Sequence, residues 1–283
     1  AVTFVKYFST MMDVHTQNFF RYCGASVFLS ILVSVAYPGC FKRYLARWRV
    51  YFFLGSMVVA FQVCWVNALY RVDPAFVSLL GKVSTPLITV MAFLFYREER
   101  KVIRKPAFLA GFAMGMAGVA GVVVGISNFK TGLMDTQLTG IVLLLISSLI
   151  WSVYANLVKH ILRTENSLQA FTFTCVSATV LFFPFMILRG NPGRLLGASP
   201  GLIALVIISG IIGIAGANSC YYLSIKRIGL AKSANLALAQ PFLVGVVSFL
   251  IFGEILTMVQ WIFGAVLLAG CALVISVEGQ NDR

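Results

Sequence analysis

The chain has 283 residues, of which 60% are hydrophobic and 11% charged, with a mean hydropathy of +0.93. A soluble domain carries about a quarter charged residues, whereas most segments here run roughly 20 residues without a charge, enough to cross a bilayer. The composition excludes a soluble domain and predicts an all-α integral membrane protein. The net charge of +13 comes from basic residues in the turns, so no nucleic-acid partner is expected.

In chain order, about ten transmembrane helices are expected, in two sets of five. They cover residues 1–12, 22–37, 50–70, 75–96, 106–126, 139–158, 168–188, 200–223, 230–252 and 259–277. The first span is incomplete, because its twelve residues rise only about 18 Å, and the chain opens with Ala rather than Met. We expect a Met and further apolar residues to precede Ala1.

Basic residues distinguish the two sets of turns. Lys42, Arg43, Arg47, Arg49, Arg97, Arg100, Lys101, Arg104, Lys105, Lys159, Arg163, Lys226 and Arg227 occupy alternate turns, and the others hold only Arg71, Lys130, Arg189 and Arg194. By the positive-inside rule, the richer set is cytoplasmic, as are both termini. This localisation in the cytoplasmic membrane assumes a prokaryotic source.

The chain repeats its own plan. A shift of 241 − 86 = 155 positions places Pro86 on Pro241, Glu99 on Glu254 and Gly115 on Gly270. We predict two five-helix repeats over residues 1–127 and 138–278. Since five is odd, the repeats are inverted relative to each other, which is the plan of a transporter whose halves rock around a central site.

Small residues mark two spans. Gly111, Gly115, Gly118, Gly121 and Gly125 lie in the fifth, and Gly210, Gly213 and Gly216 lie in the eighth. Such residues allow helices to approach closely. Static packing is favoured over a sliding surface, and the two are compatible.

Lys82 lies well inside the fourth span, where a charge costs roughly 2.5–3.5 kcal/mol and marks a functional site by default. Snorkelling of its long side chain toward the interface is the alternative. Lys6 and Arg21 lie nearer span ends, where snorkelling and interfacial anchoring are favoured. No Asp or Glu is expected deep in a span, so a cavity around Lys82 would suit a substrate with a carboxylate or phosphate.

Other polar and aromatic residues gather in five spans. The candidate substrate-binding set, with Lys82, is Gln62, Trp65, Asn67, Tyr70, Trp151, Tyr154, Asn218, Tyr221, Tyr222, Asn235 and Gln240. The alternative to substrate binding is, for each, a structural hydrogen bond between helices. Pro86 and Pro241 each remove a backbone hydrogen bond and bend their helices, either as part of a gate or as static kinks.

Catalytic and metal-binding patterns are missing from the sequence. Its six cysteines (Cys23, Cys40, Cys64, Cys175, Cys220, Cys271) show no CxxC or Cys/His spacing, and His15 and His160 are both expected in loops. Without GxSxG, HExxH or a P-loop, we expect no enzyme, no ATP-driven transport, no metal and no cofactor.

The segment "AKSANLALAQPFLVGVVSFLIFGEILTMVQWIFGAVLLAGCALVIS" resembles the second repeat of EamA-type carriers of the drug/metabolite transporter superfamily. "ALYRVDPAFVSLLGKVSTPLITVMAFLFYREE" resembles the first repeat, although "FYREER" replaces its usual apolar-Gly-Glu ending, and "FVKYFSTMMDVHTQNFFRY" is similar to the family's first helix junction. The resemblance implies ten helices in two inverted repeats, a central substrate cavity and alternating access.

These observations predict a secondary carrier of a small organic metabolite, with amino acids or related carboxylates favoured, acting alone or as a homodimer in the lipid bilayer. Lys82 would bind the anionic group. A nucleotide-sugar or sugar-phosphate antiporter, which needs more than one buried cation, and a multidrug exporter are alternatives in the same class. A scaffold without transport activity is the alternative in another class.

Overall fold

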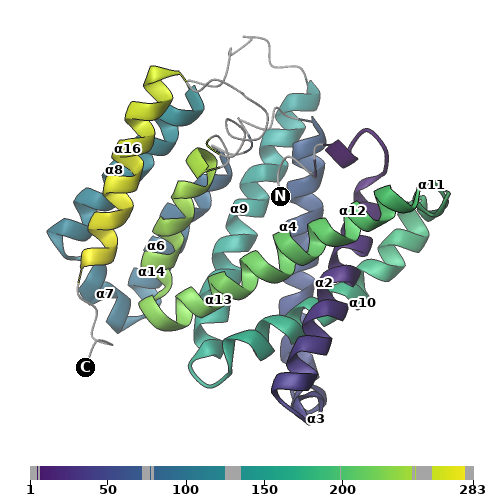
Figure 1. The fold of residues 1–283 in the computed structure, drawn as a ribbon. Helices are drawn as coiled ribbons and strands as arrows, with labels where there is room; N and C mark the ends of the chain where they lie inside the picture. The colour runs from purple at the N-terminus through teal and green to yellow at the C-terminus, as the bar shows by residue number, and fades with distance from the viewer. Residues whose placement is uncertain are drawn as a thin grey trace. The chain divides into compact units, whose positions relative to one another are not determined.

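The computed structural model describes residues 5, 7–71, 77, 80–124, 135–197, 199–243, 246 and 257–277. Within these ranges every regular element is a helix (Figure 1), which confirms the predicted all-helical class. Six helices are long and apolar enough to cross a membrane: Val14–Ala36, Trp48–Arg71, Leu138–Leu162, Ser167–Arg189, Pro200–Ile228 and Met258–Ser276. A seventh span would join Arg97–Ile103 to Pro106–Val122 across a 76° bend, and Gly81–Phe95 is a shorter apolar helix. The ten-helix inverted repeat stays a prediction.

The chain forms two compact units, each built from a segment of either half of the sequence. The first unit comprises Ala1–Arg71 and Leu157–Lys226, and the second comprises Val72–Asn156 and Arg227–Arg283. The borders at Arg71 and Lys226 lie 226 − 71 = 155 residues apart, which equals the shift of the internal repeat. Equivalent parts of the two sequence halves therefore fold together.

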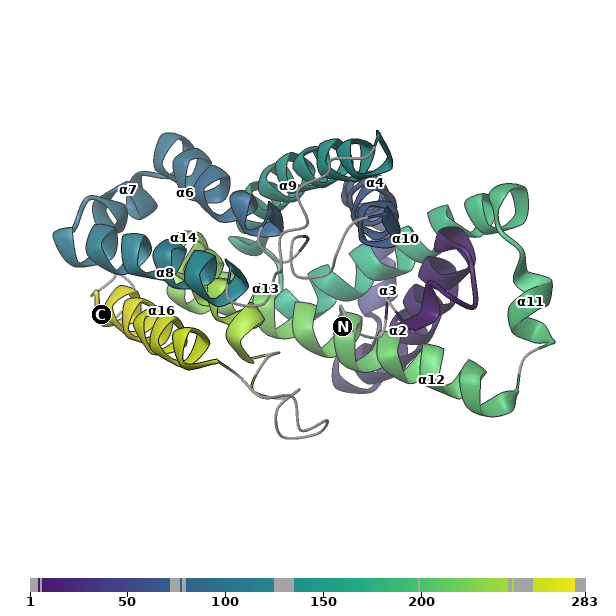
Figure 2. The same cartoon turned by 90° about the horizontal axis from the view of Figure 1, so that it is seen from above.

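The first unit contains α2 (Val14–Ala36), α3 (Cys40–Ala46), α4 (Trp48–Arg71), α10 (Ser167–Arg189), α11 (Pro192–Leu196) and α12 (Pro200–Gly210). α12 continues through a π-helical turn, η2 (Ile211–Gly216), into α13 (Ala217–Ile228). α10 packs against α2 and α4, while α12 packs against α2 (Figures 1 and 2). A Cβ on Gly210 would lie 2.1 Å from the Arg21 carbonyl oxygen, so the predicted close approach occurs at this glycine.

The start of α2 differs from its prediction. The helix begins at Val14 rather than near residue 22, because the Asp13 carboxylate accepts hydrogen bonds from the backbone of His15 and Thr16, both 2.9 Å, as an N-cap. His15 thus lies in a helix, and so does His160, in the last turn of α9 (Asp135–Leu162). The prediction of loops for both histidines was wrong.

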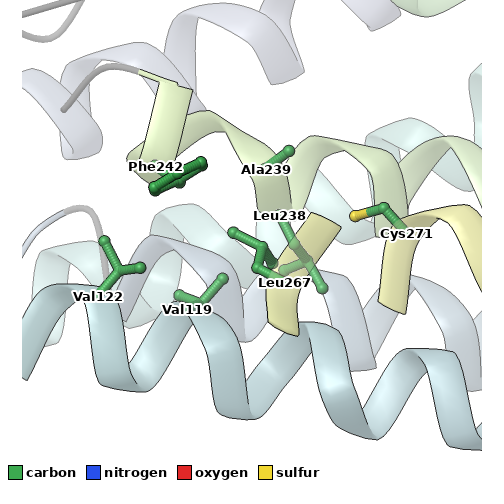
Figure 3. Close-up of a cluster of buried hydrophobic side chains, with 7 residues drawn as sticks. All are labelled: Val119, Val122, Leu238, Ala239, Phe242, Leu267 and Cys271. Atoms are coloured by element: carbon green, nitrogen blue, oxygen red, sulfur yellow. The ribbon is translucent and has the colours of Figure 1, made fainter. Parts of the chain in front are cut away.

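The second unit contains α6 (Ser84–Phe95), α7 (Arg97–Ile103), α8 (Pro106–Val124), α14 (Leu230–Leu236), α16 (Met258–Ser276) and α9 up to Asn156. Two 3₁₀ turns, η1 (Gly81–Val83) and η3 (Ala237–Ala239), lie beside α6 and α14 in the chain. α8 and α16 run side by side (Figure 1). A buried cluster joins them to η3 and the residues after it (Figure 3): Val119, Val122, Leu238, Ala239, Phe242, Leu267 and Cys271.

Glycines allow the close approach of α8 and α16. A Cβ on Gly118 would lie 2.6 Å from Leu267 Cβ, and one on Gly111 would lie 2.6 Å from the Gly270 carbonyl oxygen. Gly270, the repeat counterpart of Gly115, would in turn place a Cβ 2.8 Å from the Gly115 nitrogen. These glycines form a close contact between α8 and α16, and the predicted Gly125 lies outside the described residues.

Two charged side chains form hydrogen bonds with the backbone groups at helix ends in the second unit. Glu99, 3% exposed, accepts hydrogen bonds from Leu230 N (2.7 Å) and Ala231 N (3.1 Å) at the start of α14. Lys232 donates to the carbonyl oxygens of Ile275 and Val277 at the end of α16. Each charge has the sign that the helix dipole favours at that end. Glu254, the counterpart of Glu99, lies outside the described residues.

Candidate functional site

The helices of the second unit are interrupted four residues before each of the two predicted prolines. Pro86 lies in the first turn of α6, directly after η1, and Pro241 follows η3. A proline has no N–H for the carbonyl four residues earlier, and those carbonyls belong to Lys82 and Ala237. The two positions are 237 − 82 = 155 residues apart, so they are repeat counterparts.

The side chain of Lys82 is hydrogen-bonded to the backbone of Ala237, its counterpart in the other repeat. Its Nζ donates to the Ala237 carbonyl oxygen at 2.7 Å and to Gln240 Oε1 at 3.0 Å. The Gln240 backbone N–H also donates to the Ala237 oxygen. This carbonyl, which cannot receive a hydrogen bond from Pro241, therefore accepts two other hydrogen bonds. Both acceptors of the ammonium are neutral, and an ammonium has three N–H donors. Among the described residues, neither contact of the ammonium compensates its positive charge, and the two contacts leave one N–H donor for another oxygen.

Three further predicted residues lie in the same unit as Lys82. Asn235 is fully buried, and neither its Nδ2 nor its Oδ1 has a hydrogen-bond partner in the part of the chain that the structure describes. Trp151 and Tyr154 stand with ring centroids 5.2 Å apart on α9, which is joined to α6 by a hydrogen bond from Ser152 Oγ to the Ser84 carbonyl oxygen. An unsatisfied buried amide costs folding free energy, which marks Asn235 as a candidate ligand.

The remaining predicted residues belong to the first unit, so Lys82 and these residues are not brought together within one unit: Gln62, Trp65, Asn67, Tyr70, Asn218, Tyr221 and Tyr222. Asn67 and Asn218 each donate to the carbonyl four residues earlier on their own helix, at 2.8 and 3.0 Å. The Tyr70 hydroxyl contacts the Met12 carbonyl oxygen (3.0 Å) and Gln17 Oε1 (3.2 Å). These contacts are local or structural.

Tyr222 is 1% exposed and packs on Phe171, with ring centroids 5.1 Å apart. Gln62 is also buried, whereas Trp65 and Tyr221 are half-buried. Asn67, Tyr70 and Asn218 are half-buried as well, so five predicted residues of the first unit retain the exposure that contact with a ligand requires.

A buried polar group in the first unit was missed by the sequence analysis. Arg21 was expected to be an interfacial anchor, yet it is 2% exposed, and its Nε donates to Ser209 Oγ at 3.2 Å. Within the described ranges, Arg21 Nη1 has no hydrogen-bond partner, nor does either amide atom of the fully buried Asn18, three residues earlier on α2. The anchor prediction was wrong because α2 starts eight residues before the predicted span.

Among the described residues, Lys82 in the second unit and Arg21 in the first are both shielded from solvent, and the contacts given above for their side chains are to neutral groups. Desolvated cations of this kind attract anions more strongly than exposed ones. In the same ranges, no group of three or more His, Cys, Asp or Glu residues is arranged to hold a metal ion. Lys6 lies outside the described residues.

Known proteins were then compared with this chain. The model of the family described as "EamA-like transporter family" matches residues 1–124 and 138–276. A curated "Uncharacterized transporter" of Haemophilus influenzae is 21% identical over 285 residues, covering 98% of this chain and 93% of that protein. A solved chain described as "Crystal structure of protein" has a TM-score of 0.76 at 17% identity, covering 96% of this chain and 92% of its own, and this likeness concerns the fold alone.

Proposed function

The chain belongs to the EamA-like transporter family, and from that membership we propose that it is a secondary carrier of amino acids or related carboxylate-bearing metabolites, working by alternating access. The observation that carries the substrate class is Lys82, whose ammonium bonds two neutral acceptors and keeps its charge. A substrate carboxylate would accept the third N–H and compensate that charge. Hydrogen bonds with a charged partner contribute about 1.5–3 kcal/mol.

The proline-broken helices support a role in gating. η1 and η3 interrupt the helical hydrogen-bond pattern, and carriers use discontinuous helices of this kind to bind substrate. In this proposal Lys82 bonds Ala237 O and Gln240 Oε1 while no substrate is bound. A bound carboxylate competes for the ammonium and loosens that link.

A sugar-phosphate or nucleotide-sugar antiporter is the second candidate. It needs more than one buried cation, and Arg21 supplies a second, with Asn18 as an unsatisfied amide beside it on α2. Phosphate is recognised well by a guanidinium that can donate two hydrogen bonds at once.

Counterflow in proteoliposomes tests the proposal. The panel pairs each carboxylate with its uncharged amide and adds sugar phosphates and nucleotide-sugars. Lys82→Met should weaken binding of the carboxylate by roughly tenfold to a hundredfold while leaving the amide analogue nearly unaffected. Lys42→Met, which removes an exposed charge from α3, is the matched control and should change neither.

The paired substrates separate binding from a purely structural role of Lys82. If Lys82 only held the two broken helices together, Lys82→Met would lower transport of acid and amide alike and would lower the melting temperature. If the correctly inserted protein transports no member of the panel, the carboxylate proposal is refuted in favour of drug export or a scaffold.

We propose further that the protein lies in the cytoplasmic membrane with both termini inside, as a monomer or homodimer. The basic residues support this orientation, because Lys42, Arg43 and Arg47 on or beside α3, with Lys226 at the end of α13, gather at turns of the richer set.

A further inference from the structure

One end of the first unit carries an open amphipathic hollow that the transport proposal does not use. It lies where α4 begins and α9 ends, and consists of two adjoining parts of about 370 and 390 Å³. Val50, His160 and Ile161 line both parts, so they form one continuous surface. All of its lining residues belong to the first unit.

The larger part is the more polar of the two and carries most of the basic side chains. Arg47, His160 and Arg163 line it together with Tyr51. Tyr51 is 1% exposed, and its hydroxyl has no hydrogen-bond partner among the residues that the structure describes. A buried hydroxyl left unpaired costs free energy unless a ligand or water meets it, so this position calls for an oxygen-bearing group.

Charge in this region is strongly positive. The buried Glu165 pairs with Arg47 at 2.7 Å and Arg43 at 3.2 Å, and its backbone oxygen accepts from Lys226 Nζ at 2.7 Å. The carboxylate thus pairs with two arginines, while Lys226 lies at the backbone of the same residue and Arg49 and Arg163 line the hollow. The hollow therefore favours an anion.

The other part is apolar. Val50, Phe53, Leu54 and Leu157 line it, with Arg49 at its edge. Phe53 is 58% exposed and Val50 is 42% exposed, although both are large apolar side chains. Arg49 stands 5.8 Å from the ring of Trp48, which is half-exposed, and aromatic side chains of this kind gather at the membrane interface.

We propose that this hollow binds one anionic diacyl phospholipid of the cytoplasmic leaflet. The headgroup phosphate lies against Arg163, His160 and the Tyr51 hydroxyl, and an acyl chain lies along Val50, Phe53 and Leu157. A free phosphate ion would use the basic part alone and would leave the adjoining apolar part empty, which is why the occupant is a lipid. Basic pockets between helices on the cytoplasmic side are suited to anionic headgroups.

Native mass spectrometry of the purified protein in detergent tests this proposal by titration with dioleoyl phosphatidylglycerol, dioleoyl phosphatidylcholine or glycerol phosphate. We expect one phosphatidylglycerol to bind at least tenfold more tightly than phosphatidylcholine. The double variant Arg49→Gln with Arg163→Gln should weaken that binding by about fivefold for each charge removed. The control double variant Arg71→Gln with Arg189→Gln removes two exposed charges from the last turns of α4 and α10, which do not line the hollow, and should leave binding unchanged.

A second pair of variants tests the apolar part with every charge retained. Val50→Trp fills the hollow and should also weaken binding of phosphatidylglycerol, whereas Val180→Trp, at an exposed position on α10, should not. Equal affinity for the two lipids, equal loss in the control double variant, or unchanged binding in Val50→Trp would each overturn the proposal. Binding of glycerol phosphate as tight as that of phosphatidylglycerol would assign the hollow to a soluble anion instead.

Discussion

Asp13 joins the start of α2 to the segment after α10. Besides capping α2, its carboxylate accepts hydrogen bonds from Thr16 Oγ1 at 2.7 Å and from Asn191 N at 2.8 Å. Burial acts to raise the pKa of Asp13, but the hydrogen bonds from Thr16 and Asn191 outweigh burial, so the pKa lies below its usual value. The ionised form is therefore the one that holds the two segments together.

The first prediction is a stability difference that depends on pH. Because the folded state has the lower pKa, the charge of Asp13 stabilises the fold above its unfolded pKa of about 3.9, and this contribution disappears as the pH falls through the folded value. Asp13→Asn keeps a capping oxygen but lacks the charge. The melting temperatures of parent and variant should differ at pH 6 and converge toward pH 3; a constant gap would contradict this account.

Arg21 gives the second prediction. A buried guanidinium with an unpaired Nη1 costs desolvation energy that its bond to Ser209 does not recover. Arg21→Met fills a similar volume without the charge, so its melting temperature should equal or exceed that of the parent. Arg21→Ala leaves a cavity and should lose about 2–5 kcal/mol. If Met destabilises as much as Ala, favourable contacts of the guanidinium hold it in place.

At the scale of elements, the close contact between α8 and α16 depends on glycines, which have no side chain to separate the two helices. Gly118→Ala would place its Cβ 2.6 Å from Leu267 Cβ, and the resulting overpacking should cost about 1–3 kcal/mol. Gly201→Ala, in the first turn of α12, meets nothing within 4 Å and should be neutral or slightly stabilising. Thermal unfolding in detergent compares the two, and equal melting temperatures would contradict the packing argument.

The cap that Glu99 provides to α14 gives a fourth prediction. Gly229 precedes α14 with φ of 93°, and a Cβ there would lie 2.8 Å from Glu99 Oε1. Glu99→Gln should cost about 1.5–3 kcal/mol, and Gly229→Ala should disturb the same bonds. Hydrogen exchange at Leu230 and Ala231 should accelerate in both variants. The exposed neighbour Glu98→Gln serves as the control, and matching acceleration there would refute the cap.

Helix α8 and the helix breaks beside Pro86 and Pro241 show which features a sequence can predict. The glycine spacing in α8 was visible because it is local and periodic, and so were Pro86 and Pro241 with their shift of 155. The bonds of Glu99 to Leu230 and of Lys82 to Ala237 join residues 131 and 155 positions apart, which no local pattern reports. Asp13 was the exception: it satisfies the N-cap rule, and applying that rule would have placed Arg21 inside a helix.

At the scale of the whole molecule, the internal repeat and the two compact units agree. Unit borders at Arg71 and Lys226, the pair Lys82 and Ala237, and the pair Gly115 and Gly270 all obey the same shift. Repeat counterparts therefore fold into the same unit and, for the last two pairs, touch each other. Direct contact between counterparts is what a pseudo-two-fold relation between repeats produces near its axis.

That relation makes a prediction about orientation. If the halves are inverted, counterparts in connecting turns lie on opposite sides of the membrane; if they are parallel, counterparts lie on the same side. Lys42 and Gly197 are separated by 197 − 42 = 155 residues, and both are exposed.

In a cysteine-free background, Lys42→Cys should react only with a membrane-permeant thiol reagent in intact cells, because its turn belongs to the basic, cytoplasmic set. Gly197→Cys should react with an impermeant reagent added outside. Arg71→Cys and Lys226→Cys form a second pair with the opposite assignment, outside and inside respectively. Labelling of both members of a pair from one side would require parallel halves, and the carrier mechanism built on inverted repeats would then fail.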